Sequence, residues 1–236
     1  MIMEYGPIKY KDRIPLINKS KTISILANRL FLDAMKGVAK YAKGELLDVG
    51  CGESPFYPLF LQRTNGYVKT DILTSPGKPD IYSNITALPF KDESFDTILC
   101  THVLEHVFEP FWAFDEMKRV LRCGGVIIIG TPLIYWIHEA PVDYLRYTKY
   151  FYQKVAKVYC FEILYLKEVG GIMNVLIDIL SKGIILLSLK SKYLSFLKHI
   201  SFLVQDIGWV IIEKALRKDF AIPIINLGYV VAFRKI

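Results

Sequence analysis

Residues 46–52, Leu-Leu-Asp-Val-Gly-Cys-Gly, constrain the fold of this chain more than any other stretch. A short apolar run carries an acidic residue, turns on two glycines and leads toward Pro55, which suits the first turn of a helix. In an open α/β sheet, such a junction lies at the carboxyl ends of the strands, where ligands bind. Glycine permits the tight turn and leaves no side chain in the way of a ligand. The stretch therefore predicts a ligand-binding turn in an α/β sheet.

Strand-like and helix-like segments alternate over most of the chain. Apolar residues recur every three or four positions, which predicts helices, over residues 22–42, 107–122 and 149–158. Apolar runs predict strands at residues 45–49, 67–72, 80–82, 95–101, 126–129 and 161–167. Strands that alternate with helices predict an α/β fold with a mostly parallel sheet and right-handed crossovers.

A second acidic residue ends the second predicted strand. Asp71 follows Asp48 by 23 positions, close to the interval of ~20 residues at which dinucleotide-binding folds place a carboxylate for ribose hydroxyls. An acidic residue at one strand end carries little weight alone. Together with the glycine turn, it favours a ligand that contains a nucleoside.

Four motifs resemble those of class I S-adenosylmethionine-dependent methyltransferases, the broad group with short Rossmann-like domains. They are residues 47–52, Asp71, residues 84–90 with 94–96, and residues 103–107 with 119–125. Each motif is weak alone, but their order and spacing together make a specific signal over residues 44–131. The resemblance implies a seven-stranded sheet whose last strand is antiparallel.

The resemblance also implies which residues would hold S-adenosylmethionine. The turn formed by Gly50, Cys51 and Gly52 would approach the methionine part of the cofactor, and Asp48 would help to hold its amino group. The other contacts would be Asp71 and Ile72 at the ribose, Asn84 and the backbone of Ile85 at the adenine, and Thr101 and His102 near the methionine end. Ser54 replaces the third glycine of the usual turn, and Asn84 replaces the commoner acid. Neither departure removes the site.

Residues 131–148 follow the fifth predicted strand, so they should overhang the ligand crevice. The pattern His-x-x-Pro-x-Asp-Tyr-x-Arg-Tyr-Thr at residues 138–148 resembles that of a methyltransferase subgroup linked to cell-surface glycan and lipid-linked biosynthesis. A hydroxyl acceptor benefits from a base, and His138 is the candidate because its unperturbed pKa lies near neutrality.

Other residues of this stretch are candidates for the substrate site. Asp143 would orient His138, Arg146 would grip a phosphate or carboxylate, and Tyr135 and Tyr147 would also contact the acceptor. The alternative is structural: Asp143, Arg146 and Thr148 would then pair with one another or cap the next helix, with Thr148 as its N-cap. Upstream, we expect Glu105 and His106 to pack or cap locally.

The segment after the sixth predicted strand is unusually apolar. Residues 172–189 are interrupted by Asp178 and Lys182, so they make a poor membrane span and a good amphipathic helix. A second helical stripe covers residues 196–211. These helices would form a lid, a homodimer face or a peripheral membrane contact through residues 172–212, or would simply cover the sheet and active site as a cap. Residues 226–233 predict the last strand, which makes the helices an insertion.

Charge and cysteine content bear on partners and compartment. Of the net charge of +7, +6 lies in residues 1–43, which contain nine Lys/Arg and three Asp/Glu. Such a basic arm suits an anionic partner or is a solvated helix face. The four cysteines have no CxxC spacing, so they predict neither a zinc site nor disulfides, and we expect them to be buried. We predict no metal site and a cytoplasmic protein, with peripheral membrane contact left open.

These observations predict one domain over residues 1–236. It comprises a basic arm and helix at 1–43, a cofactor-binding core at 44–169, a helical insertion or lid at 170–222 and the last strand at 223–236. We expect S-adenosylmethionine to methylate an oxygen, less readily a nitrogen, of a small-molecule, glycan or lipid-linked acceptor. The alternatives are an RNA methyltransferase, suggested by the basic arm, and a non-catalytic membrane-associated interaction protein. We expect no nucleic-acid partner, since the sequence shows no RNA-binding module.

Overall fold

The computed structural model describes residues 25–72, 78–190, 196–215 and 225–236, and every structural statement below concerns these residues. The first 24 residues of the predicted basic arm lie outside them, as do residues 191–195 and 216–222 of the predicted insertion. The helix at the end of the arm, α1 (Ile25–Val38), continues into a short 3-10 turn, η2 (Ala39–Tyr41), as its periodicity predicted.

Seven strands form one sheet in the order β3-β2-β1-β4-β5-β7-β6. They are β1 (Glu45–Val49), β2 (Gly66–Asp71), β3 (Ile81–Tyr82), β4 (Phe95–Thr101), β5 (Leu121–Pro132), β6 (Phe161–Val169) and β7 (Gly228–Lys235). The first five strands run parallel, and β7 pairs antiparallel with both β5 and β6. The predicted mostly parallel sheet with an antiparallel last strand is confirmed. The carboxyl ends of β1, β2, β4 and β5 therefore lie along one edge.

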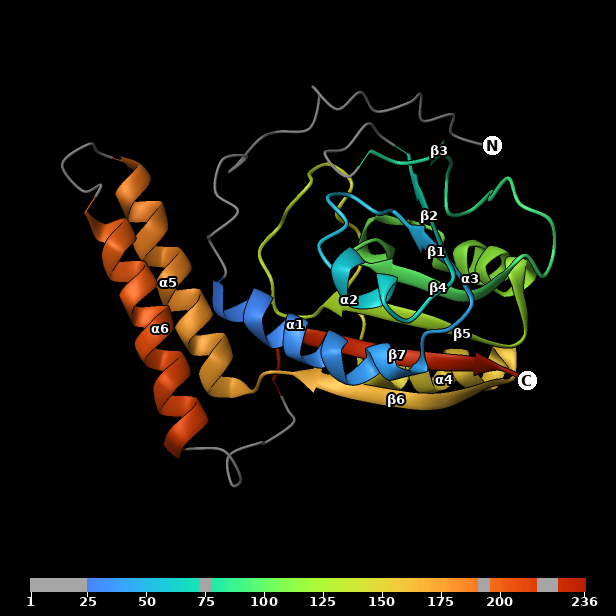
Figure 1. The fold of residues 1–236 in the computed structure, drawn as a ribbon. Coiled ribbons are helices and arrows are strands. Elements are labelled where there is room, and N and C mark those ends of the chain that lie inside the picture. The colour runs from blue at the N-terminus through green and yellow to red at the C-terminus, as the bar shows by residue number, and fades with distance from the viewer. Residues whose placement is uncertain (1–24, 73–77, 191–195, 216–224) are drawn as a thin grey trace.

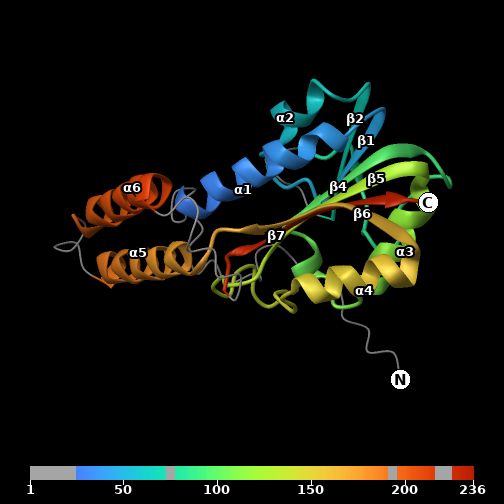
Figure 2. The same ribbon diagram turned by 90° about the horizontal axis from the view of Figure 1, so that it is seen from below.

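Helices cover both faces of the sheet and give three layers (Figure 2). On one face, α1 and α2 (Tyr57–Leu61) pack into a core with β1 and β5. On the other, α3 (Pro110–Val120) and α4 (Lys149–Tyr159) form the second core. Residues 126–129 of β5 are buried throughout, as their unbroken apolar run predicted, because a central strand of such a sheet has no solvent face.

Two predictions about local structure are wrong. The helix expected over residues 107–122 ends at Val120, because the chain enters β5 at Leu121. Cys51 and Cys100 are buried as expected, but Cys123 and Cys160 are exposed. Both exposed cysteines lie where an element begins or ends, and there an apolar neighbour does not ensure burial. Cys160 is the left-handed C-cap of α4, with φ of 55°.

Two long helices stand between β6 and β7, which confirms the predicted insertion. They are α5 (Ile172–Lys190) and α6 (Leu197–Ala215), called the hairpin below. Figure 1 shows the hairpin beyond the sheet end to which the arrowheads of β5 and β6 point, beside α1. The hairpin packs beside α1, and Val175 of α5 joins the core on that face of the sheet. That the hairpin also caps the active site stays a prediction. Within the described residues, no helix combines the length and apolar character needed to cross a membrane.

Candidate functional site

The glycine turn follows β1 and adopts the backbone that its sequence predicted. Gly50 and Gly52 have φ of 66° and 53°, in the left-handed region that favours glycine. A Cβ at Gly50 would lie 2.4 Å from Cγ2 of Val103, whereas a Cβ at Gly52 would meet nothing within 4 Å. Packing therefore requires glycine at position 50, and position 52 faces open space.

Hydrogen bonds join this turn to the end of β2. The N–H of Cys51 donates to the carbonyl of Thr70 at 2.9 Å, and the N–H of Gly52 donates to Oδ2 of Asp71 at 2.9 Å. Cys51 itself is buried. The two carboxylates thus lie in different environments. Asp71 is partly exposed beside the open turn, and Asp48 lies beneath the turn.

Asp48 is almost fully buried, at 3% exposure. Its Oδ2 accepts a hydrogen bond of 2.7 Å from the hydroxyl of Tyr67. Burial raises the pKa of Asp48 to about 7, although the hydrogen bond from Tyr67 opposes the rise. The carboxyl group therefore titrates near neutral pH.

The residues expected at the ribose and adenine differ in exposure. Ile72 is 59% exposed just beyond β2, whereas Ile85 is buried. Asn84 is exposed, and its Oδ1 accepts a hydrogen bond of 3.1 Å from the N–H of Thr86. An isolated bridge between Asn84 and Ala87 closes this loop. The loop thus has a defined backbone, with Ile85 anchored in the core.

Thr101 and His102 lie at the carboxyl end of β4, as predicted. The N–H of His102 donates to the carbonyl of Gly130 in β5 at 2.8 Å, and His102 has φ of 55°. Its ring meets that of Phe31 edge-on at 4.8 Å between centroids. A 3-10 turn, η3 (Leu104–His106), follows immediately.

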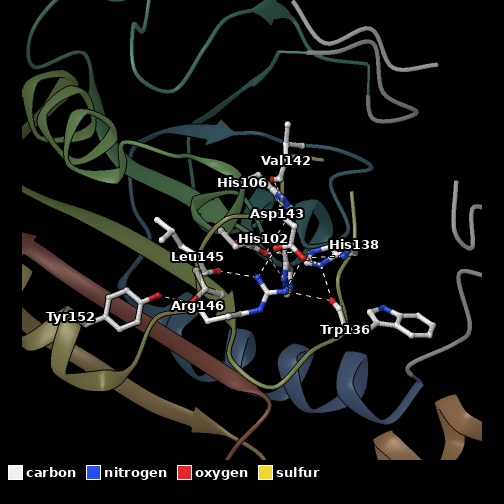
Figure 3. A network of polar contacts seen from close by, with 11 residues as sticks. His102, His106, Trp136, His138, Val142, Asp143, Leu145, Arg146 and Tyr152 are labelled. Carbon is white, nitrogen blue, oxygen red and sulfur yellow. Dashed lines mark hydrogen bonds and ion pairs between the residues drawn. The ribbon is translucent and has the colours of Figure 1, made fainter. Parts of the chain in front are cut away.

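This turn carries a buried carboxylate surrounded by imidazoles, which we call the histidine cluster: His102, Glu105, His106 and His138. Glu105 Oε1 lies 3.6 Å from Nδ1 of His102, 3.9 Å from Nε2 of His106 and 3.9 Å from Nε2 of His138. Figure 3 shows the three imidazoles facing a common centre. Both Glu105 oxygens are buried and find no hydrogen-bond partner among the described residues. Burial raises the pKa of Glu105, but His102 and His106 outweigh it, so the net pKa is lowered.

Sequence reasoning missed this cluster because it treated Glu105 and His106 as local packing or capping residues. The available signal was the distribution of histidine. Three of the four histidines of the chain lie between residues 102 and 138, on two segments that follow neighbouring strands β4 and β5. Adjacent parallel strands bring such segments together at one edge of the sheet.

The β5–α4 loop, residues 133–148, is held against η3. The N–H groups of Tyr144 and Leu145 donate to the carbonyl of Glu105 at 2.9 and 3.2 Å. The hydroxyl of Tyr147 donates to the carbonyl of Leu104 at 2.8 Å, and Tyr147 is only 4% exposed. Tyr147 is thus a core residue, and we assign it to the fold rather than to the substrate.

Asp143 and Arg146 form a clamp inside this loop. Arg146 donates from Nη1 to Oδ1 of Asp143 at 2.5 Å and from Nη2 to Oδ2 at 2.8 Å. Burial raises the pKa of Asp143, but hydrogen bonds from Arg146 and from the N–H of His138 lower it to about 2. The guanidinium is engaged by Asp143, as the structural alternative expected, and a contact of Arg146 with a substrate phosphate stays a prediction. Thr148 is the N-cap of α4, without a side-chain hydrogen bond.

His138 lies between this clamp and Glu105. Its Nδ1 is 3.3 Å from Oδ2 of Asp143 and 3.3 Å from the carbonyl of Trp136. Burial lowers the pKa of His138, and the nearby His106 adds to the effect. The structure therefore brings His138 and Asp143 together, as the sequence pattern predicted.

The hairpin reaches the same loop through a buried lysine. Lys182 is 6% exposed and donates to Oδ2 of Asp178 at 2.5 Å. Its Nζ lies 3.8 Å from the ring centroid of Tyr135 and 5.0 Å from that of Trp136. The ring of Tyr135 also meets His138 at 5.1 Å. Tyr135 thus lies between the histidine cluster and the hairpin.

The region that is similar to known proteins begins just before the glycine turn. The chain matches the family model of a methyltransferase domain over residues 47–129. An uncharacterized protein of Methanocaldococcus jannaschii is 39% identical over 88 residues, covering 36% of this chain and 39% of that protein. A tRNA U34 carboxymethyltransferase of Nautilia profundicola is 31% identical over 100 residues, covering 42% of this chain and 31% of that protein. The chain thus spans less than half the length of these relatives.

A solved methyltransferase shares the fold over most of the chain. It is the 1,6-didemethyltoxoflavin-N1-methyltransferase of Burkholderia thailandensis, with 1,6-didemethyltoxoflavin and S-adenosylhomocysteine bound. The TM-score is 0.54 at 12% identity, covering 90% of this chain and 79% of that one. The family match covers the glycine turn, Asp71 and η3, which together build the carboxyl edge of the sheet. Residues 47–129 thus match a methyltransferase domain, and the chain shares the fold of a solved methyltransferase that binds S-adenosylhomocysteine.

Proposed function

We propose that this chain transfers a methyl group from S-adenosylmethionine to an oxygen, less readily a nitrogen, of a small-molecule, glycan or lipid-linked acceptor. The observation that carries the proposal is the turn at Gly52. It is held in the left-handed region, its missing Cβ points into open space, and its N–H is bonded to the Asp71 carboxylate. A glycine backbone beside a carboxylate suits a ligand that lies close to the backbone and donates hydroxyl hydrogen bonds to the carboxylate.

The residues at the carboxyl edge fit this cofactor. Gly50, Cys51 and Gly52 would lie along its methionine part, Asp71 would accept hydrogen bonds from the ribose hydroxyls, and Asn84 would face the adenine. Asp48 would act from beneath the turn, where it holds Tyr67. Thr101 and His102 would border the methyl group, since they end the neighbouring strand β4.

The sulfonium of S-adenosylmethionine supplies an activated methyl group, so this chain mainly has to orient the acceptor. We propose His138 as the group that receives the acceptor proton, with Asp143 as its positioning residue. Support comes from the 3.3 Å distance between Oδ2 of Asp143 and Nδ1 of His138. With Nδ1 held there, Nε2 of His138 faces Glu105. Tyr135 would line the acceptor side through its contact with His138.

Calorimetric titration with S-adenosylhomocysteine tests the cofactor site. Asp71→Ala removes hydrogen bonds to a charged group, each worth about 1.5–3 kcal/mol, so affinity should fall at least about tenfold. Asp33→Ala is the matched control, because Asp33 is a 64% exposed carboxylate that pairs with Lys167 on the surface. Equal affinities of the wild type and the Asp71→Ala variant would contradict the site.

Methyl transfer is measured by incubating the chain with S-adenosylmethionine that carries a labelled methyl group. Organic-solvent, aqueous and RNA extracts of cells supply the acceptors. We expect label in the organic or aqueous fraction with the wild type, and at least about tenfold less with Asp71→Ala when S-adenosylmethionine is limiting. Label in RNA alone would favour the second candidate function, which is methylation of RNA. The match to a tRNA U34 carboxymethyltransferase motivates this candidate. Binding of RNA by the chain should then weaken steeply as the salt concentration rises.

We also propose that the hairpin meets a membrane surface peripherally, which would suit a lipid-linked acceptor. Apolar side chains are exposed along both helices at Leu176, Ile179, Leu180, Ile200, Leu203 and Ile207. Flotation with anionic vesicles should recover the full chain, and a double Leu176→Asp, Leu203→Asp variant should stay at the bottom. Sedimentation of the same proteins separates the alternative, since a homodimer face would give a dimer without vesicles.

A further inference from the structure

Three histidines and one glutamate converge at the carboxyl edge of the sheet, where a metal site was not predicted. We infer that Glu105, His106 and His138 bind a divalent transition-metal ion, with His102 at the rim. One ligand atom from each of the three residues lies within 4.8 Å of the other two. Two of them, Glu105 and His106, follow β4, and His138 comes from the β5–α4 loop, so the site closes only in the folded chain.

The hydrogen bonds around the cluster fix which imidazole atoms face its centre. Nδ1 of His106 lies 2.8 Å from the carbonyl of Val142, and a carbonyl only accepts. Nδ1 of His106 therefore carries the proton. Nδ1 of His138 faces two acceptors, the Asp143 carboxylate and the Trp136 carbonyl, both at 3.3 Å. In the neutral form of each ring, Nε2 is then a bare acceptor.

Three acceptors thus face one another, and the nearest other ring nitrogen, Nδ1 of His102, lies 3.6 Å from Oε1 of Glu105. Nε2 of His106 and Nε2 of His138 each lie 3.9 Å from Oε1 of Glu105, too far for a hydrogen bond. The Glu105 side chain is fully buried, and neither of its oxygens has a hydrogen-bond partner among the described residues. A buried carboxylate without hydrogen bonds is costly unless a cation compensates it. A metal ion satisfies all three acceptors at once.

The spacing approaches that of metal coordination. Nitrogen and carboxylate ligands lie about 2.0–2.2 Å from zinc, so two ligand atoms at a tetrahedral angle are about 3.4 Å apart. The two Glu105–histidine separations of 3.9 Å are longer than this by about 0.5 Å. The largest spread within the set, 4.8 Å, is longer by about 1.4 Å, so the side chains must close on the ion when it binds.

The outer contacts also follow the pattern of metal-binding histidines. Such residues commonly donate the other ring N–H to a carboxylate or a backbone carbonyl, which fixes tautomer and orientation. His138 has the Asp143 carboxylate in that place, and His106 has the Val142 carbonyl. Arg146 in turn holds Asp143 through two hydrogen bonds. The clamp described above thereby becomes a support for a metal ligand.

Two imidazoles and one carboxylate are ligands for first-row divalent ions such as Zn²⁺, Mn²⁺ or Fe²⁺. Three protein ligands leave coordination positions open, as in catalytic rather than structural sites. This role rests on the proposed function: an acceptor hydroxyl bound at an open position has a lowered pKa. His138 would then hold the ion in place of acting as base, and the coordinated hydroxyl would release its proton to water.

The test is a titration of the metal-free full chain with Co²⁺, whose visible absorption reports ligation by nitrogen and oxygen. The wild type should bind one equivalent. His106→Ala and Glu105→Gln should each weaken binding at least about 100-fold, and the outer variant Asp143→Asn about 10- to 100-fold. His199→Ala is the matched control, because this exposed histidine of α6 lies outside the cluster. Circular dichroism checks that each variant is folded.

The inference is overturned if the wild type gives no Co²⁺ spectrum, or if His106→Ala and His199→Ala bind equally. In the first case, the centre of the cluster would hold a proton instead. Titration with S-adenosylhomocysteine, without metal, keeps this result apart from the proposed function. A chain that binds S-adenosylhomocysteine but not Co²⁺ refutes the metal site alone, and the reverse result refutes the proposed cofactor site alone.

Discussion

Replacing Gly52 by alanine separates the ligand role of the glycine turn from its role in folding. The backbone at Gly52 has φ of 53°, where a side chain costs roughly 1–2 kcal/mol. The added Cβ meets no protein atom within 4 Å, so it lies in the space assigned to the cofactor. Crowding in a packed site costs typically about 1–3 kcal/mol, which corresponds to a loss of affinity of about 5- to 140-fold.

The chain offers a matched control for this experiment. Gly124 also has a positive φ, of 72°, and a Cβ there also meets nothing within 4 Å, but it lies at the start of β5, away from the turn. Gly52→Ala and Gly124→Ala should therefore lose similar unfolding free energy in urea. Only Gly52→Ala should weaken S-adenosylhomocysteine binding in calorimetry. Wild-type affinity in Gly52→Ala, or an equal loss in Gly124→Ala, would refute the reasoning.

Three further predictions concern buried charges. The raised pKa of Asp48, about 7 against 3.8, stabilises the fold at low pH, and this contribution is lost as pH rises through about 7. Relative to Asp48→Asn, the wild type should lose up to about 4 kcal/mol of unfolding free energy between about pH 4 and about pH 8; parallel pH profiles would contradict this. Arg146→Lys replaces the paired hydrogen bonds to Asp143 and should cost about 1–3 kcal/mol in urea unfolding. Lys182→Met leaves Asp178 buried without its partner, at a cost of about 3–5 kcal/mol. Hydrogen exchange should then speed up in α5 and α6 but not in the sheet, and unchanged exchange would argue against the pairing.

Features that depend on residues close together in the chain could be predicted from the sequence. The turn at Gly50 and Gly52, the strand end at Asp71 and the buried run in β5 each depend on local backbone preference or on burial by neighbouring layers. The mostly parallel sheet followed, because strands that alternate with helices have few ways to pack, and the antiparallel last strand followed from the family resemblance. The insertion was also predicted, since its apolar stripes have helical spacing.

Features that depend on contacts between distant segments could not be predicted. Glu105 and His138 are separated by 33 positions, and nothing local shows that β4 and β5 deliver them to one point. The engagement of Arg146 by Asp143 also depends on the path of the loop. The apolar stripes of the hairpin predict that it packs against another surface, but they do not identify that surface.

The buried Lys182 has a consequence for how the molecule moves. Its ammonium is bonded to Asp178 in the hairpin and lies over the rings of Tyr135 and Trp136 in the β5–α4 loop. Two segments 46 positions apart are thereby mechanically joined. Tyr135 in turn meets the ring of His138 at 5.1 Å. A tilt of the hairpin would therefore reach the histidine cluster through the ring of Tyr135.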